Sequence, residues 1–236
     1  MGDATFTVKD VKLGRQMSTV HITLTQEGRE EVVAYLTNSN MATESGITLQ
    51  TGWSPNPPLP PPPDDFAKLA TDGEDANWVL HRSLPYMKVR KAMNRVRIHI
   101  PRGGQAQPNV IDEWLRLESG ERFTTEAVGF VCDMWPQVLE ELLVRQLGKK
   151  KSDGSDPAWL WYPTVTLNLD FKKVLPPEGV DWLHVRIQAK QIKNGRYDYE
   201  IVIFDDTGDI VALSHHVVMV VDASRNTAPR KDGSKI

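Results

Sequence analysis

The residues of this sequence that could do chemistry include a carboxylate beside a proline-interrupted helix. Asp133 lies three residues before Pro136 in a segment with helical periodicity. A carboxylate can make a water molecule nucleophilic, and free backbone N–H groups of an interrupted helix can stabilise negative charge on a carbonyl oxygen. Asp133 also lies well off the centre of the apolar stripe of this helix, so a solvated surface aspartate is the competing interpretation.

The remaining nucleophilic and metal-binding side chains do not form the pattern of a metal or thiol site. His215 and His216 are neighbours in a predicted strand, so they point to opposite faces and cannot chelate one metal in regular geometry. The other four histidines lack ligand spacing, and the one cysteine, Cys132, cannot form a disulfide within the chain. Its place on the apolar stripe favours an inert buried thiol over a cysteine–histidine nucleophilic pair. We therefore expect no metal and no cofactor.

The helix that carries Asp133 is predicted over roughly residues 125–147. Thr124 or Thr125 can cap its start, and Pro136 predicts a kink or a break because proline removes a hydrogen bond of the preceding turn. Apolar residues recur along one stripe at three- and four-residue steps: Val128, Val131, Cys132, Trp135, Val138, Leu139, Leu142 and Leu143. We expect this stripe to pack in the curved sheet of the C-terminal strands.

Strand periodicity dominates the rest of the second half. Before the helix, residues 93–100 and 110–118 predict two strands, or one strand with a long irregular connection, after a loop or short helical region at 72–87. Four more follow the helix, at residues 160–174, 182–192, 197–205 and 210–221. The Asn194-Gly195 pair between two of them is a strong hairpin signal. Thr164 alternates with apolar residues on the first of the four, so a plain surface threonine competes with a functional one.

The first forty residues predict a three-stranded meander, at residues 5–13, 17–25 and 31–38. Residues 8–40 and 187–218 follow one plan, in which a Gly-Arg turn joins two strands and the next strand begins with Val-Ala. This repeat predicts two copies of one sheet unit, although any two antiparallel meanders share part of such a pattern. Residues 53–66 contain seven prolines and predict an extended spacer, rather than a ligand for a proline-recognising domain.

Three segments resemble the second half of the thioesterase-like double hot-dog proteins, a group that includes acyl-CoA thioesterase II. GFVCDMWPQVLE, YPTVTLNLDF and GDIVALSHHVVMVV are similar to the helix, the second strand and the last strand of that half. The resemblance covers nearly the whole chain and implies an α+β double hot-dog fold, in which an antiparallel sheet wraps around a central helix. It implies that Asp133 and Thr164 take the aspartate and threonine places that position the attacking water. His216 stands where that family has a glutamine.

The sequence departs from the family pattern in two places. A histidine can donate, accept or act as a base, so His216 can keep or change the role of the glutamine. The first hot-dog unit begins almost directly in the meander, and without its own central helix its sheet leaves an apolar face that altered packing or another chain must cover. We therefore expect a homo-oligomer. We divide the chain into a partial first unit (1–52), a proline-rich connection (53–92), a complete second unit (93–222) and a basic tail (223–236).

Two functions from different classes follow. The first is hydrolysis of an acyl thioester, on CoA or on a carrier protein, by a water activated at Asp133 and oriented by Thr164 and His216. The second is a non-hydrolytic hot-dog protein that binds acyl or polyketide intermediates, or assists an isomerisation or dehydration in a biosynthetic pathway. The histidine at position 216 and the shortened first unit favour the second.

Composition restricts the partners and the compartment. The net charge of -3 on 236 residues provides no global basic field for nucleic acid. No apolar run reaches the roughly 18 residues that span a bilayer, and the first twelve residues lack a signal-peptide core. We expect an intracellular protein of the cytoplasm or the peroxisome, because Ser234-Lys235-Ile236 differs from the peroxisomal Ser-Lys-Leu address only in its last apolar residue.

Overall fold

The computed structural model describes residues 3–82, 91–134, 138–147 and 160–222. The chain divides between Trp53 and Ser54 into two compact units. Each unit is a structure of its own, with its own antiparallel sheet.

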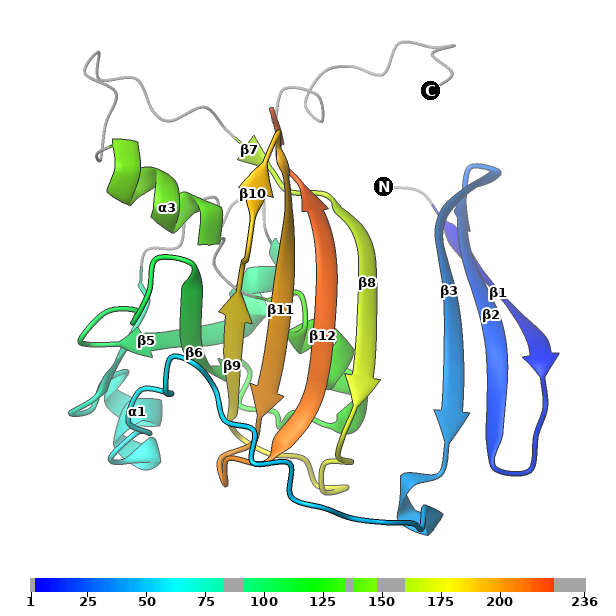
Figure 1. The fold of residues 1–236 in the computed structure, drawn as a ribbon, viewed down its shortest axis with the longest axis horizontal. Helices are drawn as coiled ribbons and strands as arrows, with labels where there is room; N and C mark the ends of the chain where they lie inside the picture. Colours follow the sequence, from blue (N-terminus) through cyan, green and yellow to red (C-terminus); the bar gives the residue numbers. More distant parts are fainter. Residues whose placement is uncertain (1–2, 83–90, 135–137, 148–159, 223–236) are drawn as a thin grey trace. The chain divides into compact units, whose positions relative to one another are not determined.

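The first unit is a three-stranded antiparallel sheet in the order β1-β2-β3 (Figure 1). Its strands are β1 (Ala4–Lys12), β2 (Met17–Gln26) and β3 (Arg29–Ser39), followed by the 3-10 helix η1 (Met41–Thr43). Glu27 and Gly28 both have positive φ, which suits the tight turn between β2 and β3. The predicted three-stranded meander is confirmed within one or two residues at each end.

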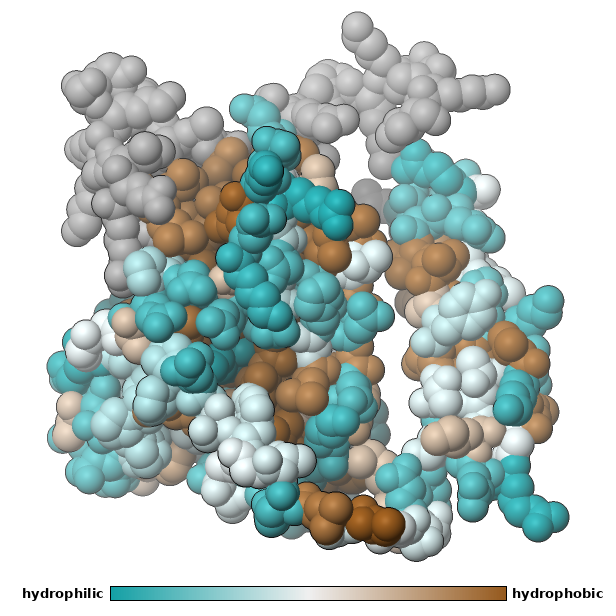
Figure 2. Space-filling model, viewed as in Figure 1, coloured by the Kyte–Doolittle hydropathy of each residue, from teal (hydrophilic) through white to brown (hydrophobic). Residues whose placement is uncertain are grey.

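One face of this sheet is apolar. The register places Phe6 beside Leu24 and Leu24 beside Val32, so apolar side chains from all three strands line up on the same side. Phe6 is 70% exposed, Val8 62% and Val32 55%, and Figure 2 shows hydrophobic residues on the surface of this unit. No α-helix occurs among residues 3–53, so the predicted unit without a central helix is what the structure contains.

The second unit is built on an eight-stranded antiparallel sheet with the order β4-β5-β6-β9-β11-β12-β8, in which β10 pairs with β11 (Figure 1). The strands are β4 (Trp78–Leu80), β5 (Val96–Pro101), β6 (Val110–Leu117), β8 (Thr164–Phe171), β9 (Leu183–Gln188), β10 (Ile192–Lys193), β11 (Arg196–Phe204) and β12 (Ile210–Met219). The short strands β7 (Leu160–Trp161) and β13 (Val221–Asp222) form a separate pair. Asn194 and Gly195 both have positive φ and join β10 to β11, as the hairpin signal predicts.

The central helical segment is divided into three parts. They are the 3-10 helix η3 (Thr125–Ala127), α2 (Val128–Val131) and α3 (Val138–Leu147). The predicted kink at Pro136 and the predicted core residue Trp135 lie outside the described residues.

The first part of the predicted apolar stripe is buried against the sheet, whereas Leu142 and Leu143 near its end are half-buried. Val128, Val131, Cys132 and Val138 share one core cluster with Ile187 of β9, Ile201 of β11 and Ala212 of β12. The buried members of the helical segment are Val128, Val131, Cys132, Met134, Val138 and Leu139. This packing confirms the arrangement of a sheet around a central helix.

The predicted threonine is found at the N-cap position, but it does not form the expected capping hydrogen bond. Thr124 occupies the first position before η3 but makes no capping hydrogen bond with its side chain. The hydroxyl of Thr125 instead accepts a hydrogen bond from the backbone N–H of Leu175, at 3.0 Å. This bond joins the start of the helical segment to the chain after β8. The threonine hydroxyl therefore anchors the segment to the sheet instead of capping its N-terminus.

Over β6 and β9, the opposite face of the sheet is covered by α1 (Phe66–Asp72) and by the proline-rich segment. The sequence predicts only a loop or short helix from residue 72 onward, whereas α1 begins at residue 66 and is followed by β4. Asp65 caps α1 by accepting from two backbone N–H groups, and Gly73 ends it with a φ of 77°. A second hydrophobic cluster, made of one leucine and three tryptophans, lies beneath: Leu69, Trp78, Trp114 and Trp182.

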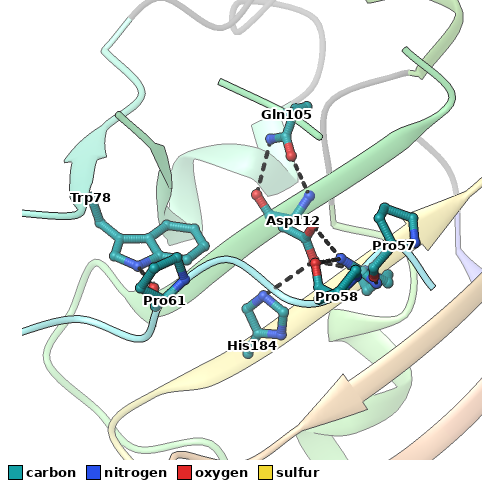
Figure 3. Close-up of polar contacts among 8 residues, drawn as sticks. Pro57, Pro58, Pro61, Trp78, Gln105, Asp112 and His184 are labelled. Atoms are coloured by element: carbon teal, nitrogen blue, oxygen red, sulfur yellow. Dashed lines mark hydrogen bonds and ion pairs between the residues drawn. The ribbon is translucent and has the colours of Figure 1, made fainter. Parts of the chain in front are cut away.

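Hydrogen bonds to its carbonyl oxygens hold the proline-rich segment on this face (Figure 3). Arg186 donates to the carbonyl oxygens of Pro57 and of Pro58, the latter at 3.2 Å. The indole N–H of Trp78 donates to the carbonyl oxygen of Pro61 at 2.8 Å. The guanidinium of Arg186 is itself held by two hydrogen bonds to Asp112, at 2.9 and 2.7 Å. The prolines therefore form a strap over the sheet, which we call the proline strap (residues 57–62).

Candidate functional site

Asp133 lies in the turn that follows α2, where its backbone N–H donates to the carbonyl oxygen of Phe130 at 3.1 Å. The side chain reaches the surface, as its position off the apolar stripe predicts. The neighbouring protein atoms nevertheless desolvate the carboxyl group, and this burial raises the pKa of Asp133 above its ordinary value. A carboxylate that is both accessible and partly desolvated is a competent acceptor for a proton of water.

The residue before Asp133 joins this turn to the middle of β12. Cys132 is fully buried, and the hydroxyl of Ser214 lies beside its thiol. Burial raises the pKa of Cys132 to about 12, so the group is a neutral thiol at physiological pH. The structure therefore supports the interpretation of Cys132 as an inert buried thiol.

His216 meets the same serine from its own strand. Its Nε2 lies 2.9 Å from the Oγ of Ser214, and the Ser214 hydroxyl donates to the carbonyl oxygen of Asn168 on β8 at 2.7 Å. His216 is buried, whereas His215 is exposed, as expected for neighbours in a strand. Burial lowers the pKa of His216 to about 4, with a smaller contribution from His215, so its imidazole is neutral at pH 7.

Thr164 lies at the start of β8, next to β12. The register pairs Leu167 with His216 and Thr166 with Val217, but a shift then pairs Thr164 with Val218. Strict alternation predicts that Thr164 shares a face with Thr166. Because of the extra residue at the shift, Thr164 instead stands opposite Val218, which is a core residue on the same side of β12 as His216.

The structure thus brings together the elements that carry the three predicted residues. The α2 turn meets β12 through the contact of Cys132 with Ser214, and β8 meets β12 through the bond from Ser214 to Asn168. The sequence-based prediction missed Ser214. Its signal was present, because a residue two positions before His216 in a strand lies on the same face.

Two other properties of the described residues bear on the chemistry. No group of three or more histidine, cysteine, aspartate or glutamate side chains in the described ranges could hold a metal ion. Among these residues there is also no helix with the length and apolar character needed to cross a membrane.

The comparison with protein families covers both units. Residues 59–220 match the family of acyl-CoA thioesterase C-terminal domains, and residues 1–39 match the corresponding N-terminal domains. The chain belongs to the acyl-CoA thioesterase family. The thioesterase-like protein TwmA of Talaromyces wortmannii is 37% identical over 270 aligned residues, which cover 99% of this chain and 76% of TwmA.

Solved structures of this thioesterase group share the fold. A putative thioesterase II from Thermobifida fusca superposes with a TM-score of 0.64 at 18% identity, over 92% of this chain and 73% of that one. The acyl-CoA thioesterase II TesB2 from Mycobacterium marinum gives a TM-score of 0.56 at 18% identity, over 93% and 74% of the two chains. The predicted family and hot-dog fold are confirmed.

Proposed function

We propose that this protein hydrolyses an acyl thioester, on CoA or on a carrier protein, with a water molecule activated at Asp133. The observation that supports the proposal is the contact between the α2 turn and β12. Cys132, the residue before Asp133, and the imidazole of His216 both lie beside Ser214. In a member of the acyl-CoA thioesterase family, a carboxylate and a neutral hydrogen-bonding ring on these elements suit the positioning of one water.

The proposed step is attack by water on the thioester carbonyl. The water oxygen bonds to the carbonyl carbon while Asp133 takes one of its protons, and the carbonyl oxygen becomes negatively charged. Backbone N–H groups in the first turn of α3 are suited to stabilise this charge, because the first turn of a helix has N–H groups without partners within the helix. Collapse breaks the carbon–sulfur bond, and the proton held by Asp133 passes to the departing thiolate.

The other two residues orient the water. The hydroxyl of Thr164 can accept from it or donate to it, and neutral His216 has one ring nitrogen that donates and one that accepts. A glutamine amide offers the same pair of a donor and an acceptor. The exchange of glutamine for histidine at position 216 is therefore compatible with hydrolysis as long as the ring stays neutral, which its pKa of about 4 ensures above pH 5.

A second function is favoured by one observation, the histidine itself. A neutral buried imidazole can also move a proton on an acyl chain, as an isomerase or dehydratase requires. In that case the protein binds acyl or polyketide thioesters and changes the acyl chain without releasing the thiol.

Thiol release from a panel of acyl-CoA esters of different chain length distinguishes the two functions. Hydrolysis predicts stoichiometric release of CoA and of the free acid. If no ester of the panel releases thiol while mass spectrometry shows an isomerised or dehydrated acyl-CoA, the second function replaces the first. If the esters bind and remain unchanged, both reactions are excluded for these substrates and a binding role remains.

A further inference from the structure

A groove of about 290 Å³ lies between α3 and the connection from β9 to β10 in the second unit. Its apolar walls come from α3 on one side and from the chain around β10 on the other: Leu139, Leu142, Leu143, Ala189 and Ile192. Leu142 and Ile192 also pack against the core cluster, so the core reaches the surface here. The volume lies near the lower end of the range of about 300–1,000 Å³ for ligand pockets, which suits one narrow chain.

The polar groups that line this groove already have partners. The backbone N–H of Ala189 donates to the carbonyl oxygen of Asn109 at 3.0 Å, and its carbonyl oxygen accepts from the side-chain amide of Asn109 at 2.8 Å. Among the residues that line the groove only Lys190 is charged, and it forms an ion pair with Glu200. An alkyl chain can therefore displace water here without leaving either backbone group of Ala189 unpaired.

The groove lies on the same side of the sheet as the α2 turn, which carries Asp133. That turn lies beside Ser214, which pairs with Ile201 on β11, and Ile201 pairs with Ile187 on β9. Ala189 lies two residues beyond Ile187, on the same face of the chain, and both belong to the core cluster. Two strand spacings of about 4.8 Å and two residues of about 3.3 Å separate the α2 turn from the groove by about 12 Å.

We infer that this groove binds the alkyl part of the acyl thioester, so that straight acyl chains long enough to reach it are the preferred substrates. The class of substrate rests on the proposed hydrolysis at Asp133, whereas the binding of an alkyl chain does not. A straight chain advances about 1.25 Å per carbon, given carbon–carbon bonds of about 1.5 Å and angles of about 111°. About ten carbons therefore span the distance of about 12 Å, and the later carbons of a longer chain lie in the groove.

Calorimetric titration of the full chain with hexanoate, octanoate and decanoate tests the groove without any turnover. Each added methylene that is buried should lower the Kd by about fourfold. Leu142→Trp and Leu143→Trp narrow the groove and should raise the Kd of decanoate by about tenfold or more. Val174→Trp is the matched control, because it adds a tryptophan at an exposed position that does not line the groove. No binding, equal Kd values for the three acids, or an unchanged Kd in both groove variants overturns the inference.

Nuclear Overhauser effects between decanoate and the protein locate the chain without a substitution in the groove. The alkyl protons of decanoate should show such effects to the Cδ1 methyl group of Ile192, whose signal is assigned by its loss in Ile192→Val. Effects that involve only methyl groups outside the groove would overturn the inference.

The value of kcat/KM for thiol release links the groove to the proposed reaction. The two groove variants should lower kcat/KM for dodecanoyl-CoA by about tenfold or more, and should leave the value for hexanoyl-CoA unchanged, because the shorter chain does not reach the groove. Equal losses for both esters would overturn the assignment of the groove to the acyl chain and leave the proposed hydrolysis standing. Chain-length-dependent binding in a protein that releases no thiol would support the groove and reject the hydrolysis.

Discussion

The buried pair of Asp112 and Arg186 should dominate the stability of the outer face of the second unit. Asp112 is 0% exposed and Arg186 4%, and together they anchor the proline strap through the carbonyl oxygens of Pro57 and Pro58. Arg186→Met leaves the carboxylate buried without its partner and the two carbonyls without a donor. Breaking a buried pair in this way costs about 3–5 kcal/mol of unfolding free energy.

Urea unfolding at 25 °C, followed by tryptophan fluorescence, measures this loss. Trp78, Trp114 and Trp182 lie in the cluster on the strap side of the sheet and report on this face. With a denaturant slope of about 2 kcal/mol per M urea, the midpoint of Arg186→Met should fall by about 2 M. The double variant Asp112→Leu/Arg186→Met should regain much of the loss, because no unpaired charge stays buried.

The pH dependence of Arg186→Met provides a second check. Burial raises the pKa of Asp112 and Arg186 opposes that shift, so removal of the arginine raises the pKa further. A folded-state pKa above the unfolded one means that the folded state binds more protons, so the variant should regain stability as the pH falls from 8 to 6. A midpoint within about 0.5 M of wild type, or a double variant as unstable as the single one, would refute the reasoning.

Three further outcomes follow from the structure. Burial raises the pKa of Glu113 well above 4.5, so the free energy of unfolding should fall as the pH rises above 4.5, by up to about 1.4 kcal/mol per pH unit. Glu113→Gln should abolish this slope, and equal slopes in both proteins would contradict the expectation. The pKa of His216 is lowered to about 4, so the free energy of unfolding of wild type should fall by about 3 kcal/mol between pH 6.5 and 4. His216→Gln should lack that fall and should still hydrolyse within tenfold of the wild-type rate. Identical acid unfolding curves for the two proteins would count against this expectation. The exposed apolar face of the first unit should mediate self-association. The double variant Phe6→Asp/Val8→Asp should therefore have a lower molar mass in solution, measured by light scattering. A wild-type protein that is already monomeric would contradict this expectation.

Local patterns predicted the elements that bury one face. The helical stripe was predictable because Val128, Val131 and Val138 recur at helical spacing and all face the sheet. The turn at Asn194-Gly195 was predictable because few other pairs tolerate positive φ at both positions. Such signals depend only on neighbours within one element.

The features that the sequence did not reveal depend on contacts between distant residues. The strap is held by Arg186 bonding to Asp112, 74 positions away, and to Pro58, 128 positions away, which no local period records. Both faces of β6 are buried. The alternation of apolar and polar residues therefore does not reveal that Glu113 faces the core while Asp112 lies beneath the strap. The register shift that moves Thr164 arises where β8 pairs with β12, and it alters a pattern that looks regular in the sequence.

In the proposed reaction, the carboxylate of Asp133 activates the water that cleaves a thioester. The most direct test is kcat/KM for thiol release from the best acyl-CoA ester, measured for wild type, Asp133→Asn and the control Asp206→Asn, which changes an exposed aspartate in a turn far along the chain. Removal of a general base should lower the rate by about 100-fold or more in Asp133→Asn, while Asp206→Asn should stay close to wild type. Equal rates for wild type and Asp133→Asn would contradict the claim.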